Sequence, residues 1–124
     1  MPGSQADKQL ARVRKIVMAF PEVTERLSHG APTWFVRGKK TIATLADDHH
    51  GSGILGLVCA APPGVQETMI DEEPERFYRP PYVGGRGWLG VRLDRPCPDT
   101  ELRAILMDAY RTVAPKALAA RLEA

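Results

Sequence analysis

The sequence is poor in the features that mark several classes of protein. It has two cysteines in 124 residues, whereas small disulfide-stabilised domains are far richer in cysteine. No apolar run reaches the roughly 20 residues that a membrane-spanning helix needs, and the N-terminal residues lack the apolar core of a secretory signal. The formal net charge is +2 at pH 7, which neither favours nor excludes nucleic-acid binding. These absences predict a cytoplasmic protein in a reducing compartment, with no membrane partner.

Catalytic motifs are also scarce. No G-x-S-x-G, P-loop lysine or H-E-x-x-H sequence is present. Cys59 ends an apolar run, Cys97 lies between two prolines, and neither has a neighbouring histidine that would activate it as a nucleophile. A small hydrophobic side chain is the simplest interpretation of Cys59. We therefore expect a non-enzymatic protein with no catalytic residue and no cofactor.

Two glycine strings, residues 51–56 and 85–90, match the dinucleotide-binding pattern G-x-G-x-x-G. A dinucleotide site requires these glycines after a strand and at the start of a helix, where free backbone N–H groups meet the pyrophosphate. Both strings lead into predicted strands instead. We interpret the glycines as turn residues and as places where a strand packs closely against a helix.

The segment Asp47–His50 raises the question of a metal site. Zinc usually takes three or four ligands that converge from different directions, whereas adjacent side chains on a turn point apart. The sequence contains one other histidine, His29. We interpret the segment as a solvated turn and expect no metal site.

The spacing of apolar residues predicts helices towards both ends of the chain and strands between them. The predicted helices cover residues 8–20, a short segment from Val65 that Pro74 ends, residues 100–113, and a final helical piece after Pro115. The predicted strands cover residues 33–37, 41–46, 54–60 and 87–94. Short connections favour antiparallel pairing, because parallel strands need longer crossovers. The sequence therefore predicts an α+β fold: a two-layer sandwich with an antiparallel sheet and helices packed on one face, in one domain spanning residues 1–124.

The last predicted strand supplies a candidate binding surface. Its alternation places Leu89, Val91 and Leu93 towards the core. Trp88 and Arg92 then lie on the opposite face, which the predicted helices leave open. A tryptophan beside an arginine on an open sheet suits base stacking or a protein contact. Burial of Trp88 beneath the preceding loop is the alternative.

Further basic residues surround this predicted face. Arg79 and Arg86 precede the strand, and the turn between the first two predicted strands is basic; such a turn can contact a phosphate backbone without reading bases. The acidic residues at 71–75 exclude a polyanion from their corner of the surface. The candidate nucleic-acid-binding residues are Arg37, Lys39, Lys40, Arg79, Arg86, Trp88 and Arg92.

The ordered set of motifs resembles the MmcQ/YjbR family. The motifs are ERLSHGAPTWFVRGKKTIATL, DDHHGSG, APPGVQE, PERF, PPYVG, RGWLGVRLD and AYRTVAPKALAARL, and they cover the chain from about residue 8. The resemblance implies a small bacterial protein with a frataxin-like fold, described as DNA-binding or double-wing, and it supplies no catalytic residue. Where the family's turn typically reads H-H-G-D-G, this chain has Ser52 at the aspartate position.

Two functions remain open from the sequence. The first is a non-enzymatic protein that binds DNA through phosphate contacts of the basic hairpin and the open sheet face, with affinity that falls steeply with salt. The second is an interaction module, of unknown pathway, that binds a protein or a small ligand through the Trp88/Arg92 face. Basic side chains gathered on one surface would favour the first function, and scattered ones would count against it.

Overall fold

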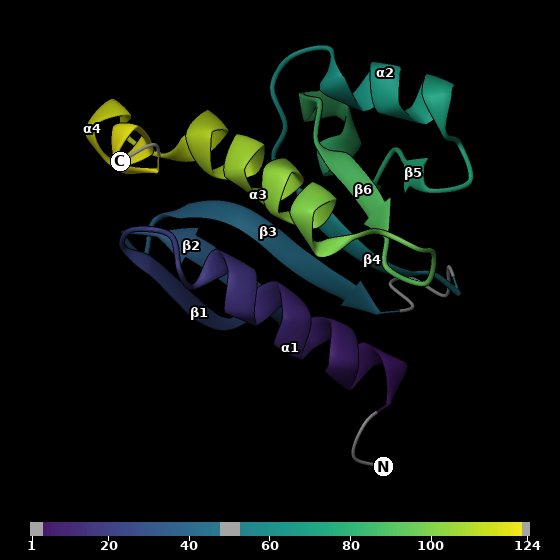
Figure 1. Cartoon of the computed structure of the whole chain (residues 1–124), viewed down its shortest axis with the longest axis horizontal. Coiled ribbons are helices and arrows are strands. Elements are labelled where there is room, and N and C mark those ends of the chain that lie inside the picture. The colour runs from purple at the N-terminus through teal and green to yellow at the C-terminus, as the bar shows by residue number, and fades with distance from the viewer. Residues whose placement is uncertain (1–3, 48–52, 123–124) are drawn as a thin grey trace.

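A six-stranded antiparallel sheet with helices packed on one face forms the fold of the computed structural model, which describes residues 4–47 and 53–122 (Figure 1). The helices are α1 (Gln5–Val17), α2 (Val65–Glu72), α3 (Asp99–Val113) and α4 (Lys116–Arg121), with a 3₁₀ turn η2 (Val83–Arg86). The strands are β1 (Val23–Ser28), β2 (Ala31–Val36), β3 (Lys40–Asp47), β4 (Leu55–Cys59), β5 (Phe77–Tyr78) and β6 (Leu89–Arg92). They follow the order β1-β2-β3-β4-β6-β5 across the sheet. The predicted two-layer α+β class is confirmed.

Local signals explain where the helices begin and end. The Ser4 hydroxyl accepts a hydrogen bond from the Asp7 N–H at 3.1 Å and caps α1, so α1 begins one residue after Ser4. Asp99 is the first residue of α3, and Pro98 precedes it as the cap. Pro98 and Pro115 stand at the cap positions of α3 and α4, where a missing N–H and a fixed φ do no harm. None of the described helices is long and apolar enough to cross a membrane.

Two strands were not predicted from the sequence. β1 is an edge strand in which Val23 alone is buried, while Leu27 is 70% exposed, so it lacks the alternation that marks a half-buried strand. β5 is two residues long and pairs with β6. Both strands depend on their neighbours for their conformation.

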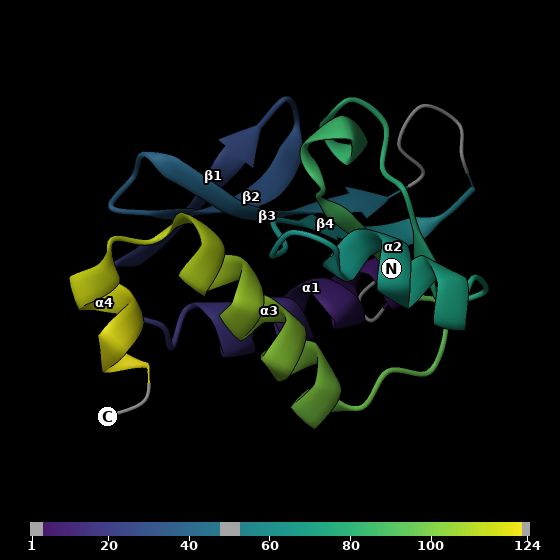
Figure 2. The same cartoon turned by 90° about the horizontal axis from the view of Figure 1, so that it is seen from above.

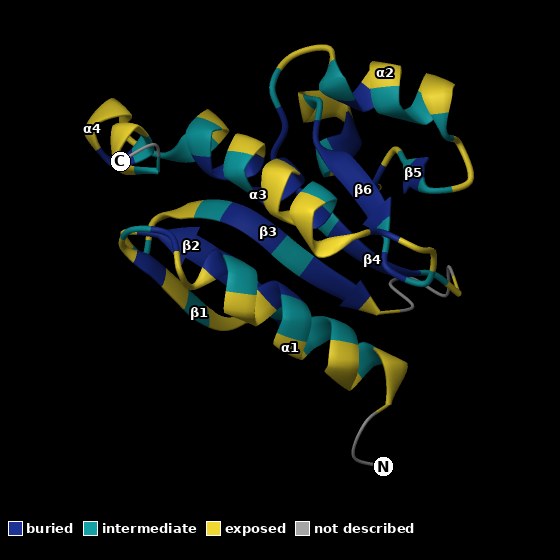
Figure 3. Cartoon of the chain, viewed as in Figure 1, coloured by how far each residue is buried: buried dark blue, intermediate teal, exposed yellow. Residues whose placement is uncertain are grey.

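The core lies between the sheet and the helices α1 and α3. Leu89, Val91 and Leu93 are buried in it, as the alternation predicts, together with Val13 and Val17 of α1. Figure 3 shows the burial: the central strands are mainly buried, and the outward sides of the helices are exposed. The opposite face of the sheet carries none of these helices (Figure 2); we call it the outer face.

An ion pair closes the core at the edge of the sheet. The buried Trp34 donates its indole N–H to Glu25 at 2.9 Å, and the same carboxylate accepts two hydrogen bonds from Arg14 at 2.7 Å each. The hydrogen bonds from Arg14 hold the pKa of Glu25 below its ordinary value, with a smaller contribution from the Trp34 indole, although partial burial opposes the shift. The carboxylate is therefore more stable in the folded chain than in the unfolded one.

This pKa shift predicts a pH dependence of stability. A carboxyl whose folded pKa lies below its unfolded value of about 4.3 contributes stability above that pH and loses it as the pH falls through the folded pKa. The free energy of unfolding should therefore decrease below about pH 4, and less steeply in Glu25→Gln than in the wild type. Urea titrations across the acidic range measure this. Asp71→Asn, at an exposed position of α2, is the control; an equally shallow curve for it would contradict the assignment to Glu25.

Candidate functional site

The outer face is basic along its strands. Residues paired across an antiparallel sheet share a face, and the side-chain oxygens of Thr33 and Thr44, 3.2 Å apart, mark this one. Its strand residues are Thr24, Arg26, Thr33, Phe35, Thr44, Ala46, Gly56, Val58, Tyr78, Gly90 and Arg92. Two of them are arginines and none is a carboxylate.

Arg26 lies flat on this face. Its guanidinium carbon is 3.7 Å from the centroid of the Phe35 ring, and its Nη1 donates to the Gly38 carbonyl at 3.3 Å. The ring is thereby covered and only 5% exposed, as expected of a cation–π contact. No ion pair holds Arg26 among the described residues. The sequence prediction missed this residue because it missed β1, whose residues VTERLS do not alternate between apolar and polar.

Tyr78 covers the other half of the outer face. Its ring lies over Gly56 and Gly90: a Cβ at Gly90 would meet ring carbons at 2.5 Å, and one at Gly56 would overlap the Tyr78 hydroxyl. Burial raises the pKa of Tyr78 to about 12. These are the last glycines of the two G-x-G-x-x-G strings. They therefore pack against an aromatic ring on the outer face, not against a helix as the sequence suggested.

The middle glycines of the two strings, Gly53 and Gly87, have a left-handed backbone. Gly53 has φ +71° and Gly87 has φ +86°, a backbone region that glycine adopts without strain. Neither string opens an α-helix, so neither offers a row of free N–H groups for a pyrophosphate. The interpretation as a turn residue is confirmed for Gly87, which ends the 3₁₀ turn η2.

Residues 79–88, which we call the 79–88 loop, rise on the outer side of the sheet (green in Figure 2). Gln66 of α2, 2% exposed, fixes the loop from below: its amide nitrogen donates to the carbonyls of Gly84 at 2.8 Å and Trp88 at 2.5 Å. The stem of Arg79 packs on Gly84, where a Cβ would meet its Cγ at 2.6 Å. The loop is therefore an ordered part of the fold.

Trp88 is buried beneath this loop, so the prediction of an accessible tryptophan is wrong. Trp88 is 8% exposed, and its backbone N–H donates to the Val83 carbonyl. The Arg86 guanidinium lies 5.4 Å from the centroid of the Trp88 ring. The regular strand begins only at Leu89, and the loop folds back over the preceding residue. The alternative that the sequence left open is the correct one.

The other predicted residues do not form one surface. Arg37 pairs with Glu22 at 3.1 Å. Lys40 pairs across the sheet with the buried Val36 of the helix-covered face, and Lys39 is exposed in the turn. Since β3 and β6 are both antiparallel to β4, the β2–β3 turn and the 79–88 loop lie at the same end of the sheet, whereas Arg92 lies at the other.

Arg92 also has a carboxylate partner. Its guanidinium makes two hydrogen bonds to Asp94, at 3.0 and 2.8 Å, and these bonds hold the pKa of Asp94 below its ordinary value. An arginine already paired in this way has less to gain from a phosphate. Arg79 and Arg86 are exposed and form no ion pair with a described residue. Like the exposed Lys39 and Lys40, they remain available to a ligand.

The two cysteines considered as nucleophiles are both buried. Burial raises the pKa of the Cys59 thiol to about 12 and also raises that of Cys97, which opposes thiolate formation. Within residues 4–47 and 53–122, no group of three His, Cys, Asp or Glu side chains could hold a metal ion. His49, His50 and Ser52 lie outside the described residues.

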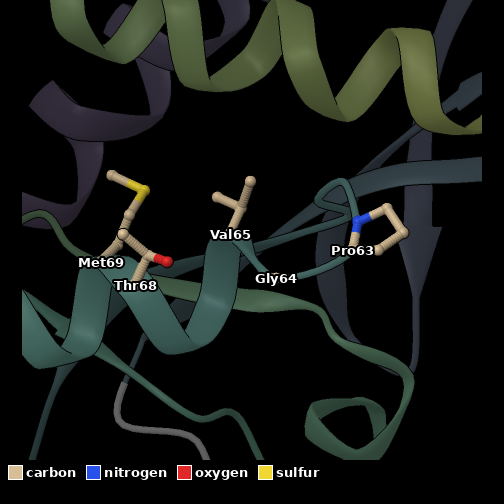
Figure 4. A pocket seen from close by; sticks show the side chains of 5 residues that line it. All are labelled: Pro63, Gly64, Val65, Thr68 and Met69. Atoms are coloured by element: carbon tan, nitrogen blue, oxygen red, sulfur yellow. The ribbon is translucent and has the colours of Figure 1, made fainter.

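An apolar hollow of about 340 Å³ opens at the start of α2 (Figure 4). Its lining residues are Pro63, Gly64, Val65, Thr68 and Met69. Thr68 supplies the single polar side chain among them, and no lining residue is charged. The hollow therefore offers no charged side chain to a phosphate.

Comparison with known proteins identifies similar chains. The model of the YjbR family matches residues 18–112, more than half of the chain. A crystal structure of the Deinococcus radiodurans protein DR2400, which has a DUF419 domain, is similar in fold: the TM-score is 0.72 at 19% sequence identity, over 92% of this chain and 87% of that one. No curated protein sequence matches. At this identity the structural similarity concerns the fold alone.

Proposed function

The chain belongs to the YjbR family, and on this premise we propose that it is a non-enzymatic, cytoplasmic protein that binds nucleic acid, DNA foremost, through phosphate contacts on the outer side of its sheet. The observation that carries the proposal is a charge asymmetry. From residue 76 to residue 93 the sequence contains four arginines and no carboxylate. The middle of this stretch, the 79–88 loop, rises on the outer side with Arg79 and Arg86 exposed.

Arg26 extends this basic surface across the sheet. It lies on the same outer face, and the strand residues between it and the loop include no carboxylate. The acidic residues at 67, 71 and 72 belong to α2, which precedes the 79–88 loop in the chain and is not part of the sheet. A polyanion can therefore contact Arg26, Arg79 and Arg86 without meeting a negative side chain of the sheet. Contacts of this kind position a backbone but carry no sequence information.

The alternative function, a protein- or ligand-binding module, loses its original aromatic contact because Trp88 is buried. Arg92, the second residue of that surface, is paired with Asp94. The predicted basic residues do not form one surface, which counts against the surface as it was predicted. The nucleic-acid proposal therefore rests on the narrower set Arg26, Arg79 and Arg86, which form no ion pair with a described residue. A salt-tolerant complex with a protein would be the sign of the alternative.

Removal of two of the proposed phosphate contacts should weaken binding. We expect Arg79→Gln/Arg86→Gln to bind a labelled oligonucleotide roughly tenfold more weakly than the wild type at about 100 mM salt, with a shallower salt dependence. Fluorescence anisotropy measures both affinities. Lys116→Gln/Arg121→Gln changes the net charge equally on α4, which lies on the helix side of the sheet (Figure 2), and should bind like the wild type. Equal losses in both variants would show a general charge effect and count against the proposed surface.

A further inference from the structure

Tyr82 is held outward on the 79–88 loop. Its side chain is 85% exposed, and its backbone has φ +64° and ψ −63°. The Val83 N–H donates to the Pro81 carbonyl at 2.7 Å, which closes a tight γ-turn around Tyr82. This turn is rare and strained for a residue with a side chain. Strained positions of this kind persist where the surrounding structure enforces them, and they cluster at binding sites.

The surrounding structure does enforce this conformation. Pro80 and Pro81 fix the approach to the turn, and the Gly84 N–H donates to the Pro80 carbonyl at 3.0 Å. The buried Gln66 holds the following residues from below. Little backbone entropy remains to be lost when a ligand contacts the loop, which favours binding through a preorganised contact.

The charges around Tyr82 indicate the kind of ligand. The guanidinium of Arg79 lies near Gly84 and Gly85, where its Nη2 would be 3.6 Å from a Cβ at Gly85. Arg86 is exposed at the end of the same 3₁₀ turn. Along the loop, the exposed Tyr82 lies between Arg79 and Arg86. This order suits an unpaired base flanked by phosphates, because bases stack on aromatic rings and backbones follow positive charge. In a duplex the faces of the bases are already stacked on each other, so they are not available to stack on Tyr82.

We propose that the 79–88 loop binds single-stranded nucleic acid, with an unpaired base stacked on Tyr82 and the adjoining phosphates on Arg79 and Arg86. The proposal rests on the proposed function and specifies its ligand. It gives the loop a role that neither the basic β2–β3 turn nor the outer strands supply. It also predicts that the contact tolerates different bases, since every base has a stacking face.

The test compares a labelled single strand of about 12 nucleotides, within the range that small single-strand-binding domains cover, with its duplex. By fluorescence anisotropy, the single strand should bind more tightly, and Tyr82→Ala should weaken it roughly tenfold while changing duplex binding little. Tyr82→Phe keeps the ring and should retain the affinity. Tyr82→Gly removes the ring and also relieves the strain of the positive φ. If Tyr82→Gly loses as much single-strand affinity as Tyr82→Ala, the loss is due to the missing ring and not to misfolding. Leu27→Ala truncates an exposed apolar side chain of β1 and should have no effect.

An abasic strand separates stacking from charge. It keeps the phosphates but offers no base, so wild type and Tyr82→Ala should bind it equally. Duplex binding that weakens with salt, without a single-strand preference or a Tyr82 effect, would overturn this inference and leave the proposed function in place. Flat titrations with every oligonucleotide would overturn the proposed function, and this inference with it.

Discussion

Gly90→Ala is expected to lower the free energy of unfolding by about 2 kcal/mol, the range for overpacking a filled site. A Cβ at residue 90 would meet three carbons of the Tyr78 ring at 2.5 to 2.7 Å. The ring is bounded by Gly56 on the neighbouring strand, so it must leave the outer face to make room. In a strand without this contact, the same change would stabilise the protein slightly, because glycine loses more conformational entropy on folding. The sign of the effect therefore identifies the contact.

A double-mutant cycle isolates the Tyr78 contribution. In the Tyr78→Ala background the Cβ has space, so Gly90→Ala should cost less there than in the wild type, with a coupling of at least about 1 kcal/mol. Gly85→Ala is the matched control, because its Cβ would make only an ordinary contact at 3.6 Å. Urea titrations give each free energy. Additive effects at Gly90 and Tyr78 would contradict the packing described.

Gln66→Met is expected to destabilise the protein by about 2–3 kcal/mol, since it leaves two buried carbonyls without their donor. Methionine is close to glutamine in size but donates no hydrogen bond. The carbonyls of Gly84 and Trp88 would both lose the amide nitrogen that now binds them. Because these bonds hold the 79–88 loop, the variant should also bind oligonucleotides less tightly than the wild type.

Hydrogen exchange tests this role directly. The Trp88 N–H donates to the Val83 carbonyl within the loop, and its protection should fall in Gln66→Met more than that of the central strands. Thr68→Met, at an exposed position two residues further along α2, should change stability by less than about 0.5 kcal/mol. An unchanged Trp88 exchange rate would contradict the claim that Gln66 orders the loop.

The sequence predicted the layers of the fold because strong periodic segments carry them. The apolar stripes of α1 and α3 and the continuous run of β4 face one core, and short connections determine antiparallel order. The sequence did not predict β1, since its exposed Leu27 breaks the alternation, nor the two-residue β5. These strands form because their neighbours offer backbone partners, which is tertiary information.

The candidate site was predicted only in part. Arg79 and Arg86 were identified from charge and remain exposed. Trp88 was placed by the alternation of a strand that begins at Leu89, two residues later than predicted. Tyr82 was missed because a positive φ at a tyrosine cannot be read from its neighbours. The sequence context of the two G-x-G-x-x-G strings, which lead into strands, argued against a dinucleotide site. It did not show that the Tyr78 ring requires glycine at 56 and 90, because that contact joins residues far apart in the sequence.

The most direct test of the proposed polyanion surface is the salt dependence of single-strand binding by the wild-type protein. If Arg26, Arg79 and Arg86 each neutralise one phosphate, the logarithm of the association constant should fall with the logarithm of salt concentration with a slope of about −2. Between about 50 and 200 mM salt, this slope corresponds to roughly 20-fold weaker binding. Anisotropy titrations that show saturable binding with this slope would support the account. Binding that does not change with salt, or no saturable binding at the lower concentration, would contradict it.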